Sequence, residues 1–266
     1  MSVRIVFSDI DGTLLNDERV LSKKTIEVFK KLKTNIPVVL ISARMPKAMR
    51  HLQEMGNLSD QPIIAYNGGL VLVNNEIVHS TEIPNSITTA ITEFDLAIHF
   101  SLYHNDDWYV PKKDYWTKRE INNTKVEAEI LANNKVIDLW NKKQIGAHKI
   151  MCMGNIDDID RLSIFLEDNY NELLHIYRSK STYIEVTPKS ISKKTAITYL
   201  LDRLYTNISL NEAAAFGDNY NDIEMIEAVG YGVAVANAKD EVKQIAKYKT
   251  TSGNKDGVAK FLENYI

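Results

Sequence analysis

The sequence predicts an α/β protein in which a doubly wound parallel sheet forms a core and a smaller α+β domain is inserted into it. Three observations lead to this prediction. Short apolar runs alternate with helical patterns over the first 80 residues, the middle of the chain is richer in aromatic residues, and the alternation returns after Ser190. Strands that alternate with helices favour a parallel sheet with helices on both faces. We therefore expect a core from residues 1–83 and 189–266, with the inserted domain over residues 84–188.

The first core segment contains three apolar runs that are short enough to be strands. Val3–Ser8, Pro37–Ser42 and Ile63–Tyr66 are typical of strands buried on both faces. A helix is expected from Ser22, because serine favours helix N-termini and apolar residues follow it at helical spacing. This order of strands and helices predicts parallel pairing.

The middle segment shows strands of a different pattern, with aromatic residues among them. Four strands are expected, at Ile98–Tyr103, Asp107–Pro111, His148–Met153 and Tyr183–Val186. The first two are joined by the polar turn His104–Asp106, which predicts a hairpin. A helix is expected across Ile156–Tyr170, where apolar residues recur at helical spacing. The segment is therefore expected to form a small α+β domain with its own sheet.

The last segment returns to the pattern of the first. Helices are expected at Lys193–Leu204, from Asp222, and at Gly257–Tyr265, with strands at Ala213–Gly217 and Gly232–Ala236. The simplest arrangement joins these elements to the N-terminal strands in one sheet, so that both ends of the chain build the core.

The bulk composition excludes several classes of function. The net charge of −3 provides no basic surface for nucleic acid, and no run approaches the ~18 apolar residues of a membrane span. The N-terminus lacks the long apolar segment of a secretory signal. The single cysteine, Cys152, cannot form an internal disulfide, and the six histidines show no paired zinc spacing. We expect a cytoplasmic protein without nucleic-acid or membrane partners.

Asp9 and Asp11 follow the first expected strand and stand two residues apart. Residues i and i+2 of an extended backbone face the same side. Both side chains are therefore expected in the crevice at the carboxyl end of the strand, where open α/β sheets bind their ligands. Two adjacent carboxylates repel each other unless a cation or a shared proton lies between them. The pair thus indicates a site for a metal ion and a phosphate group.

Three further polar clusters occupy similar positions. Ser42 ends the second expected strand, Lys193 begins a helix, and Gly217–Asp222 lies where a strand meets a helix. Backbone N–H groups and the helix dipole favour anions at such positions. The interval from Ser42 to Lys193 is 151 residues (193 minus 42). Because one crossover needs only a few tens of residues, this interval is expected to hold the inserted domain.

In this order the clusters resemble the four motifs of the haloacid dehalogenase superfamily: Asp-x-Asp-Gly-Thr at 9–13, Ser42, Lys193, and Gly-Asp-x-x-x-Asp at 217–222. The superfamily has a Rossmann-like core. An insertion between the second and third motifs is similar to the class IIB cap of the Cof-type sugar-phosphate phosphatases. Asn237-Ala238 agrees with the same subgroup. The resemblance covers both core segments, whereas over the cap it is one of layout.

The resemblance implies a role for each motif in phosphoryl transfer. Asp9 would be the nucleophile that forms an aspartyl-phosphate, as carboxylates can. Asp11 would protonate the departing alkoxide and later deprotonate the hydrolytic water. The Ser42 hydroxyl and the Lys193 ammonium would hold the non-bridging phosphate oxygens.

It also implies a Mg²⁺ cofactor and a set of neighbouring polar groups. Asp9 and Asp218 would bind the ion, together with the backbone carbonyl of Asp11, a phosphate oxygen and waters, which is the usual environment of Mg²⁺. Asp222 would share the face of Asp218, and it is assigned to positioning metal-bound water more readily than to direct ligation. Asn221 is a plausible donor to the site.

Two candidates have open roles. Arg44 would either bind substrate, which we favour slightly, or pair with a carboxylate at the sheet edge. Asn67 would either be a turn residue or line the substrate cleft.

The sequence therefore predicts a Mg²⁺-dependent phosphomonoesterase with a mobile cap, acting on small phosphorylated metabolites and on sugar phosphates first. A monomer or a weak homo-oligomer is expected. Two alternatives remain. A phosphosugar mutase would use the same aspartyl-phosphate but return the phosphoryl group to a sugar, and a non-catalytic sugar-phosphate sensor would bind without turnover.

Overall fold

The computed structural model describes residues 2–32, 35–94 and 97–265, and the chain divides into two compact units. Met1–His79 and Ser192–Ile266 form one, which we call the core unit, and Ser80–Ile191 form the other, the inserted unit. The expected inserted domain, 84–188, lies within the second. In the described part of the chain, no helix is long and apolar enough to cross a membrane.

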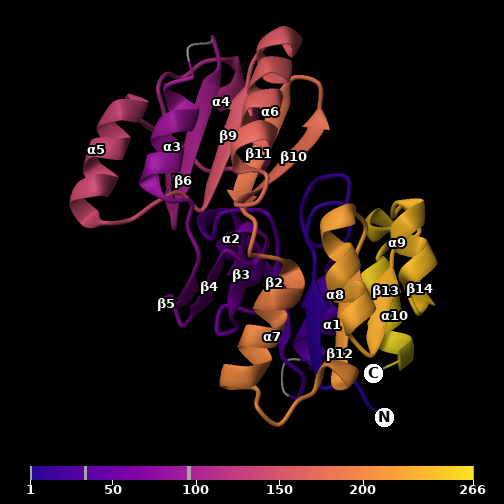
Figure 1. The fold of residues 1–266 in the computed structure, drawn as a ribbon. Coiled ribbons are helices and arrows are strands. Elements are labelled where there is room, and N and C mark those ends of the chain that lie inside the picture. Colours follow the sequence, from indigo (N-terminus) through magenta and orange to yellow (C-terminus); the bar gives the residue numbers. More distant parts are fainter. Residues whose placement is uncertain (1, 33–34, 95–96, 266) are drawn as a thin grey trace. The chain divides into compact units, whose positions relative to one another are not determined.

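The core unit is built on an eight-stranded sheet in the order β14-β13-β12-β1-β2-β3-β4-β5 (Figure 1). Its strands are β1 Ile5–Ser8, β2 Val38–Ile41, β3 Ile63–Ala65, β4 Leu70–Val73, β5 Glu76–Ser80, β12 Ala213–Gly217, β13 Tyr231–Ala234 and β14 Tyr248–Lys249. Pairing is parallel from β14 to β3, and β4 runs antiparallel to β3. β1 therefore pairs with a strand from each end of the chain, as the sequence predicts.

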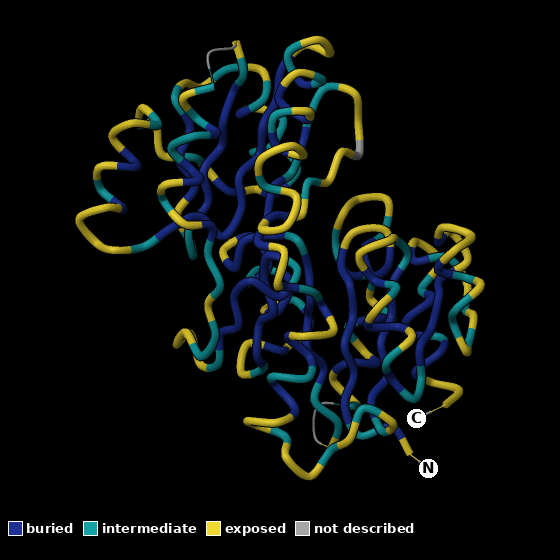
Figure 2. The backbone as a smooth tube through the Cα atoms, viewed as in Figure 1, coloured by how far each residue is buried: buried dark blue, intermediate teal, exposed yellow. Residues whose placement is uncertain are grey.

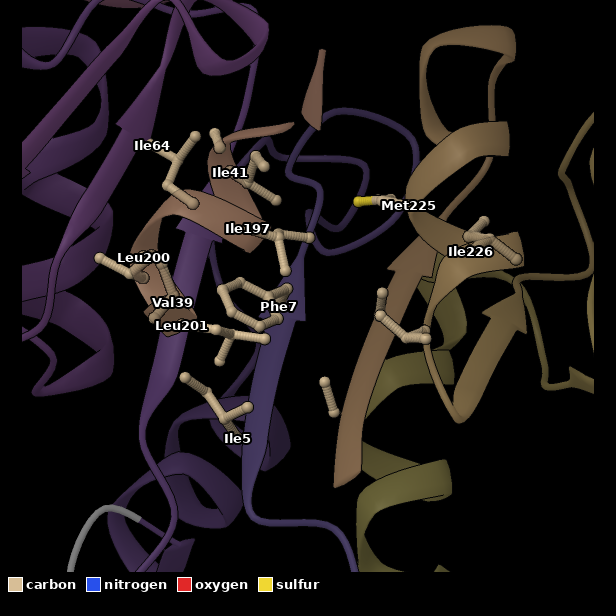
Figure 3. Packing of buried hydrophobic residues seen from close by; sticks show 14 of the residues in the cluster. Ile5, Phe7, Val39, Ile41, Ile64, Ile197, Leu200, Leu201, Met225 and Ile226 are labelled. Atoms are coloured by element: carbon tan, nitrogen blue, oxygen red, sulfur yellow. The ribbon is translucent and has the colours of Figure 1, made fainter. Parts of the chain in front are cut away.

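Helices cover both faces of this sheet. They are α1 Lys23–Leu32, α2 Lys47–Gly56, α7 Lys193–Leu204, α8 Ile223–Ala228, α9 Asp240–Ile245 and α10 Gly257–Tyr265. Figure 3 shows Ile197 and Leu201 of α7 packed against Phe7 of β1. Phe216 of β12 meets Phe261 of α10 edge to face, with ring centroids 5.4 Å apart.

The contact of α7 with Phe7 and the contact of α10 with Phe216 lie on opposite faces of the core sheet. Ala215 belongs to the cluster beneath α7 and α8, and Phe216 is the next residue of the same strand. Because successive residues of a strand point to opposite sides, α10 lies on the face opposite α7. α1 packs against both α2 and α10. The doubly wound core expected from the sequence is thus confirmed.

The inserted unit has a six-stranded sheet of its own, in the order β10-β11-β9-β6-β7-β8. Its strands are β6 His99–His104, β7 Asp107–Val110, β8 Glu129–Ile130, β9 Lys149–Met153, β10 Leu174–Lys180 and β11 Tyr183–Pro188; its helices are α3 Asn85–Thr92, α4 Tyr115–Thr124, α5 Asn133–Lys143 and α6 Ile156–Tyr170. The sheet is antiparallel except where β8 pairs with β7. Apolar residues of α3, α5 and α6 pack on one sheet face, and Cys152 is buried among them.

Figure 2 shows the central strands of each unit buried and the exposed residues on loops and outer helix faces. In the core unit all four residues of β1 and of β2 are buried. Strands covered on both faces read as continuous apolar runs, which is why the sequence reveals them.

Several expected strands differ from the structure by one or two residues at an end, and three of the expected elements are discussed here because the cause of the difference is visible. β3 ends at Ala65, because Tyr66 and Asn67 adopt left-handed backbone conformations that a strand cannot contain (φ 51° and 56°). The helix expected from Asp222 begins at Ile223, after the 3₁₀ turn Tyr220–Asp222. The strand expected at Gly232–Ala236 is Tyr231–Ala234, whose register is set by pairing with β12.

Candidate active site

The candidate residues gather at one edge of the core sheet. Asp9 follows β1, Ser42 follows β2 and Asp218 follows β12, and these three strands are parallel neighbours (Figure 1). The chain leaves β1 toward β2 on one side, while β12 comes from the C-terminal segment on the other. In α/β sheets, ligands bind at the carboxyl ends of the strands where the strand order reverses in this way.

The turn after β1 brings the first motif against Asp218. β1 ends at Ser8, and Gly12 has φ +85°, a left-handed conformation that favours glycine. A Cβ atom at Gly12 would overlap the Asp218 carboxylate. The Thr13 hydroxyl donates to Asp218 Oδ1 at 3.0 Å. Glycine thus permits the close approach, and the threonine orients the carboxylate.

Lys193 lies fully buried between two carboxylates. Its helix α7 begins at this residue, because Ser192 and Thr195 form a capping box just before it. Lys193 Nζ donates to Asp9 Oδ1 at 2.5 Å and to Asp222 Oδ1 at 2.6 Å. Burial lowers the pKa of this ammonium, but the charges and hydrogen bonds of Asp222 and Asp9 outweigh burial and raise it above its ordinary value. The lysine therefore stays charged inside the protein.

Asp222 uses both of its oxygens on the protein itself. Oδ1 accepts from Lys193, and Oδ2 accepts from the backbone N–H groups of Asp218 at 2.9 Å and Asn219 at 3.0 Å. A Cβ atom on Gly217 would overlap the Asp222 side chain, so glycine is needed there. Asp222 thus orders the loop that carries Asp218 and anchors Lys193, which leaves it poorly placed for direct ligation of a metal.

Asp9, Asp218 and Asp222 offer carboxylate oxygens that all lie within 4.8 Å of one another. Burial, with the charges of Asp222 and Asp218, raises the pKa of Asp9 to about 8 even beside Lys193. Burial and Asp222 raise the pKa of Asp218 to about 6. Three carboxylates around one ammonium leave excess negative charge, which a divalent cation would neutralise. The residues therefore fit Mg²⁺, with Asp9 and Asp218 as the carboxylates that would hold it.

Asp11 does not join this cluster, in contrast to the expectation that it projects together with Asp9. The extended backbone ends at Ser8, and residues 11–14 form a turn, so the i, i+2 relation no longer applies. The Asp11 carboxylate instead accepts from Arg44 Nε at 2.7 Å, from Arg44 Nη2 at 2.8 Å and from Arg19 Nη2 at 2.9 Å. Burial raises the pKa of Asp11, but the two arginines outweigh burial and hold this pKa below its ordinary value.

Arg44 is 8% exposed, and its bidentate pair with Asp11 is the carboxylate pairing that the sequence left open. Ser42 is also buried, and its Oγ accepts from the Arg44 N–H at 3.2 Å. This bond uses a lone pair of Oγ, so the Ser42 hydroxyl could still donate its proton to a phosphate oxygen.

The side chains of Asn67, after β3, and Asn221, after β12, are joined by a hydrogen bond. The Asn221 amide Nδ2 donates to Asn67 Oδ1 at 2.9 Å, and the Asn67 N–H donates to Ser42 O at 2.8 Å. Asn67 therefore belongs to the turn that supports Ser42, and it also contacts Asn221 of the fourth motif, residues 217–222.

Sequence reasoning assigned no role to three residues that the structure brings to the site. Thr13 orients Asp218, Arg19 pairs with Asp11, and Asn237 connects two loops. Asn237 Nδ2 donates to Gly12 O at 2.7 Å, and its Oδ1 accepts from the Gly253 N–H at 2.9 Å. Thr13 and Asn237 were visible as parts of motifs, whereas nothing in the local pattern singles out Arg19.

A second group of possible ligands lies in the inserted unit. Glu82, His104 and His148 come together there despite their spacing in the sequence. His148 Nδ1 accepts from the Asn105 N–H, which places the ring proton on Nε2, next to Ser80 Oγ. Both ring nitrogens are therefore committed to hydrogen bonds, and the group is a hydrogen-bond network in which His148 is not set up as a metal ligand.

Comparisons with known proteins identify the family of the chain. The model of the haloacid dehalogenase-like hydrolases matches residues 6–262. A Haemophilus influenzae protein named "Putative phosphatase" is 34% identical over 99% of this chain and 98% of its own. The 5-amino-6-(5-phospho-D-ribitylamino)uracil phosphatase YcsE of Bacillus subtilis is 30% identical over 100% of this chain and 97% of its own.

Solved structures share the fold over nearly the whole length. TM0651 from Thermotoga maritima is 29% identical, covers 98% of this chain and 97% of its own, and gives a TM-score of 0.88. The subclass IIB sugar phosphatase BT4131 is 23% identical, covers 99% of both chains, and gives a TM-score of 0.80, which shows a common fold. The chain belongs to the haloacid dehalogenase-like hydrolases, as a Cof-type phosphatase with a class IIB cap.

Proposed function

We propose that this phosphatase hydrolyses small phosphorylated metabolites, sugar phosphates foremost, in a Mg²⁺-dependent reaction that passes through an aspartyl-phosphate on Asp9. The observation that carries the proposal is the arrangement around Lys193. One buried ammonium bridges Asp9 and Asp222, and Asp218 lies beside them at the carboxyl edge of the sheet. Phosphoryl transfer needs an in-line nucleophile and positive charge around the transferred group, and Asp9 would be the nucleophile while Lys193 and Mg²⁺ would supply the charge.

In the first half-reaction, a carboxylate oxygen of Asp9 attacks phosphorus while the bond from phosphorus to the ester oxygen breaks. In this step Asp11 must start in its protonated form; it gives its proton to that oxygen, so the leaving group departs as a neutral alcohol. The Ser42 hydroxyl and the Lys193 ammonium donate to the non-bridging oxygens of the phosphoryl group. They stabilise the charge that spreads over these oxygens in the transition state.

In the second half-reaction, Asp11 takes a proton from a water molecule, whose oxygen attacks phosphorus. The bond from phosphorus to the Asp9 oxygen breaks, which restores the Asp9 carboxylate and releases inorganic phosphate. The same carboxyl group thus alternates between acid and base, and the protein ends in its starting protonation state.

Asp9 and Asp218 would hold the metal ion, with Thr13 orienting Asp218 and Asp222 ordering its loop. When bound, Mg²⁺ supplies charge neutralisation for the phosphoryl oxygens and for the carboxylates around them. Asn67 and Asn221 line the approach to the same edge and would contact the substrate, while Arg44 holds Asp11 in place.

The substrate class rests on the chemistry of the relatives. The Bacillus subtilis relative is named for a phosphate ester of a ribityl chain, which is a small polyhydroxylated metabolite. Sugar phosphates share that chemistry, since both present a primary phosphate ester beside several hydroxyl groups. Hydrolysis of such phosphate esters is consistent with the phosphatase family to which this chain belongs.

The test is inorganic phosphate release from a panel of sugar phosphates, polyol phosphates, nucleotides and cofactor phosphates. Each substrate is measured with Mg²⁺, with a chelator, and with Asp9→Asn as the blank. We expect release that needs both Mg²⁺ and Asp9. Conversion of a sugar phosphate to its isomer without net phosphate release would point to the mutase. Binding of sugar phosphates without any turnover would point to the sensor, and either result would refute the proposal.

A further inference from the structure

We infer that Asn67 is a positioning residue for Ser42, and that it acts through the left-handed conformation of its backbone. This inference rests on the proposed function, in which the Ser42 hydroxyl donates to a phosphoryl oxygen. It concerns a turn outside the four motifs. It also goes beyond a contact between the Asn67 amide and the substrate, because the effect of the turn reaches the substrate through Ser42.

The turn at residues 66–68 has a strained backbone. Tyr66, Asn67 and Gly68 have φ values of 51°, 56° and 105°, so three successive residues have positive φ. Glycine and asparagine adopt such conformations readily, whereas for a bulky residue such as tyrosine they are outliers. Strained backbone persists only where the surrounding structure holds it, and it clusters at functional sites.

The turn directs two successive N–H groups at the loop that carries Ser42. The Asn67 N–H donates to Ser42 O at 2.8 Å, and the Tyr66 N–H donates to Arg44 O at 3.1 Å. Successive residues of an extended strand alternate in direction, so a strand could not make both bonds to one loop. Successive N–H groups of a turn can converge on one side. The conformation of Tyr66 and Asn67 therefore fastens the turn to the loop of Ser42.

Ser42 is held by hydrogen bonds on both sides of its Cα atom. Its N–H donates to Ile64 O at 3.0 Å, its carbonyl accepts from the Asn67 N–H, and its Oγ accepts from the Arg44 N–H at 3.2 Å. The first bond continues the pairing of β2 with β3, whereas the second depends on the turn. A donor stabilises a transition state best when its direction is fixed beforehand. The turn would supply that fixed direction to the Ser42 hydroxyl.

The turn is anchored on two other elements of the core unit. A Cβ atom on Gly68 would overlap the Ser192 carbonyl oxygen, so glycine lets the turn close on the residue that caps α7. Asn67 Oδ1 accepts from Asn221 Nδ2 at 2.9 Å, which ties the turn to the fourth motif. The turn thus contacts the loops of the second, third and fourth motifs.

The experiment compares Asn67→Gly with Asn67→Val. Both substitutions remove the side-chain amide, but only glycine keeps the left-handed conformation, because a β-branched residue is an outlier there. Asn74→Val is the matched control, because Asn74 also has positive φ, 53°, and is exposed in the turn after β4 of the same unit. Each protein is assayed with Mg²⁺ on the best sugar phosphate of the panel and on 4-nitrophenyl phosphate.

We expect Asn67→Val to lower kcat/KM about 10- to 50-fold, a part of the ~10²–10³ that one preorganised donor contributes. The two substrates should lose equally, because Ser42 would hold the phosphoryl group that they share. Asn67→Gly should lose less than about threefold, because the turn keeps its conformation. Asn74→Val should match the wild type.

A double-mutant cycle tests whether the effect passes through Ser42. The hydroxyl is absent from Ser42→Ala, so adding Asn67→Val to this variant should cost less than about threefold instead of about 10- to 50-fold. Circular dichroism verifies that each variant is folded. If Asn67→Val does not fold, Asn67→Ala takes its place in the cycle, since alanine is also disfavoured at positive φ.

Three results would overturn the inference while the phosphatase proposal stands. They are equal losses for Asn67→Gly and Asn67→Val, a loss confined to the sugar phosphate, and an equal loss for Asn67→Val with and without the Ser42 hydroxyl. The first two would indicate that the Asn67 amide contacts the substrate. A wild-type protein that releases no phosphate from any ester would instead refute the proposed function, and the role of Asn67 with it.

Discussion

Lys193 and Asp222 are joined by a hydrogen bond of 2.6 Å between groups that are both almost completely buried. The same ammonium reaches Asp9, so one lysine couples the loop after β12 to the loop after β1. Two loops from opposite ends of the chain are thereby fixed to each other at the sheet edge. Without the positive charge of Lys193, the carboxylates of Asp9 and Asp222 would repel each other.

Lys193→Met should both destabilise the core unit and abolish phosphate release. The substitution keeps the bulk of the side chain but leaves the buried carboxylates without their counter-charge, which costs about 3–5 kcal/mol. Chemical unfolding in a chelator measures this loss. Lys194→Met is the matched control, because Lys194 is the next residue of the helix and is exposed. If the two variants were equally stable and active, Lys193 would have no such role.

Asp9→Asn should be inactive yet more stable than the wild type in the absence of metal. Activity is expected to fall on the order of 10⁴-fold or more, as for the loss of other nucleophiles. Burial raises the pKa of Asp9 from its ordinary value to about 8. The folded state therefore binds this proton more tightly, and the stabilisation is lost as pH rises from about 4 to about 8.

The advantage of Asp9→Asn over the wild type in a chelator should consequently grow between pH 5 and pH 8, measured as the difference in Tm. Mg²⁺ should raise the Tm of the wild type more than that of the variant, because ligands stabilise the state that binds them. A constant difference across this pH range would contradict the electrostatic account of the site.

The core strands could be predicted because they are buried on both faces and appear as apolar runs. The hairpin of β4 and β5 was not predicted, although Leu70–Val73 is apolar and Asn74-Asn75 follows it. Both asparagines have positive φ, 53° and 65°, as a two-residue hairpin turn of the primed type requires. This turn chemistry was present in the sequence and was overlooked.

Other elements carry little signal in the sequence. α4 has only two buried residues, Thr117 and Thr124, so no apolar face marks it as a helix. Asp114 begins this helix by accepting from the N–H groups of Trp116 and Thr117, a capping pattern that many loops share. Long, amphipathic α6 was predicted with its observed bounds.

The candidate site also has one part that the sequence predicts and another that it does not. The motif order predicts which strand ends and helix starts meet, because parallel strands carry their carboxyl ends to one edge. The direction of the Asp11 side chain depends on the turn at Gly12 and on an arginine 33 residues later, so spacing alone could not reveal its pairing with Arg44. The roles of the individual residues stay predictions until the variants are measured.

Thr13→Val should weaken the binding of Mg²⁺ while leaving the fold intact. The Thr13 hydroxyl is fully buried and donates to Asp218 Oδ1, and valine has nearly the same shape without the donor. Loss of a group that orients a metal ligand costs about 10–100-fold in affinity. The Mg²⁺ dependence of phosphate release measures the change. Thr25→Val, at another buried threonine of the core unit, should leave this dependence unaltered.

The inserted unit should lose stability in acid through His148. Burial, together with the charge of the neighbouring His104, lowers the pKa of His148 from its ordinary value to about 3. The ring also faces Ser80 and, through its hydroxyl, Glu82, so the neutral form is held in a hydrogen-bond network. The folded state binds fewer protons than the unfolded state, and stability is therefore lost as pH falls from about 6.5 toward 3.

This loss can be followed in the inserted unit alone. The chain has three tryptophans, Trp108, Trp116 and Trp140, and all of them lie within Ser80–Ile191. Urea unfolding monitored by tryptophan fluorescence at pH 7 and pH 4.5 should show a drop in stability, at about 1.4 kcal/mol for each pH unit over which the unfolded state alone binds the proton. His148→Asn keeps an acceptor for the Asn105 N–H but cannot titrate, so its stability should be lower at pH 7 and depend less on pH. A variant whose pH dependence equals that of the wild type would show that His148 does not carry the acid sensitivity, and His99, which is buried and pairs with the half-buried Asp114, would then be the residue to substitute.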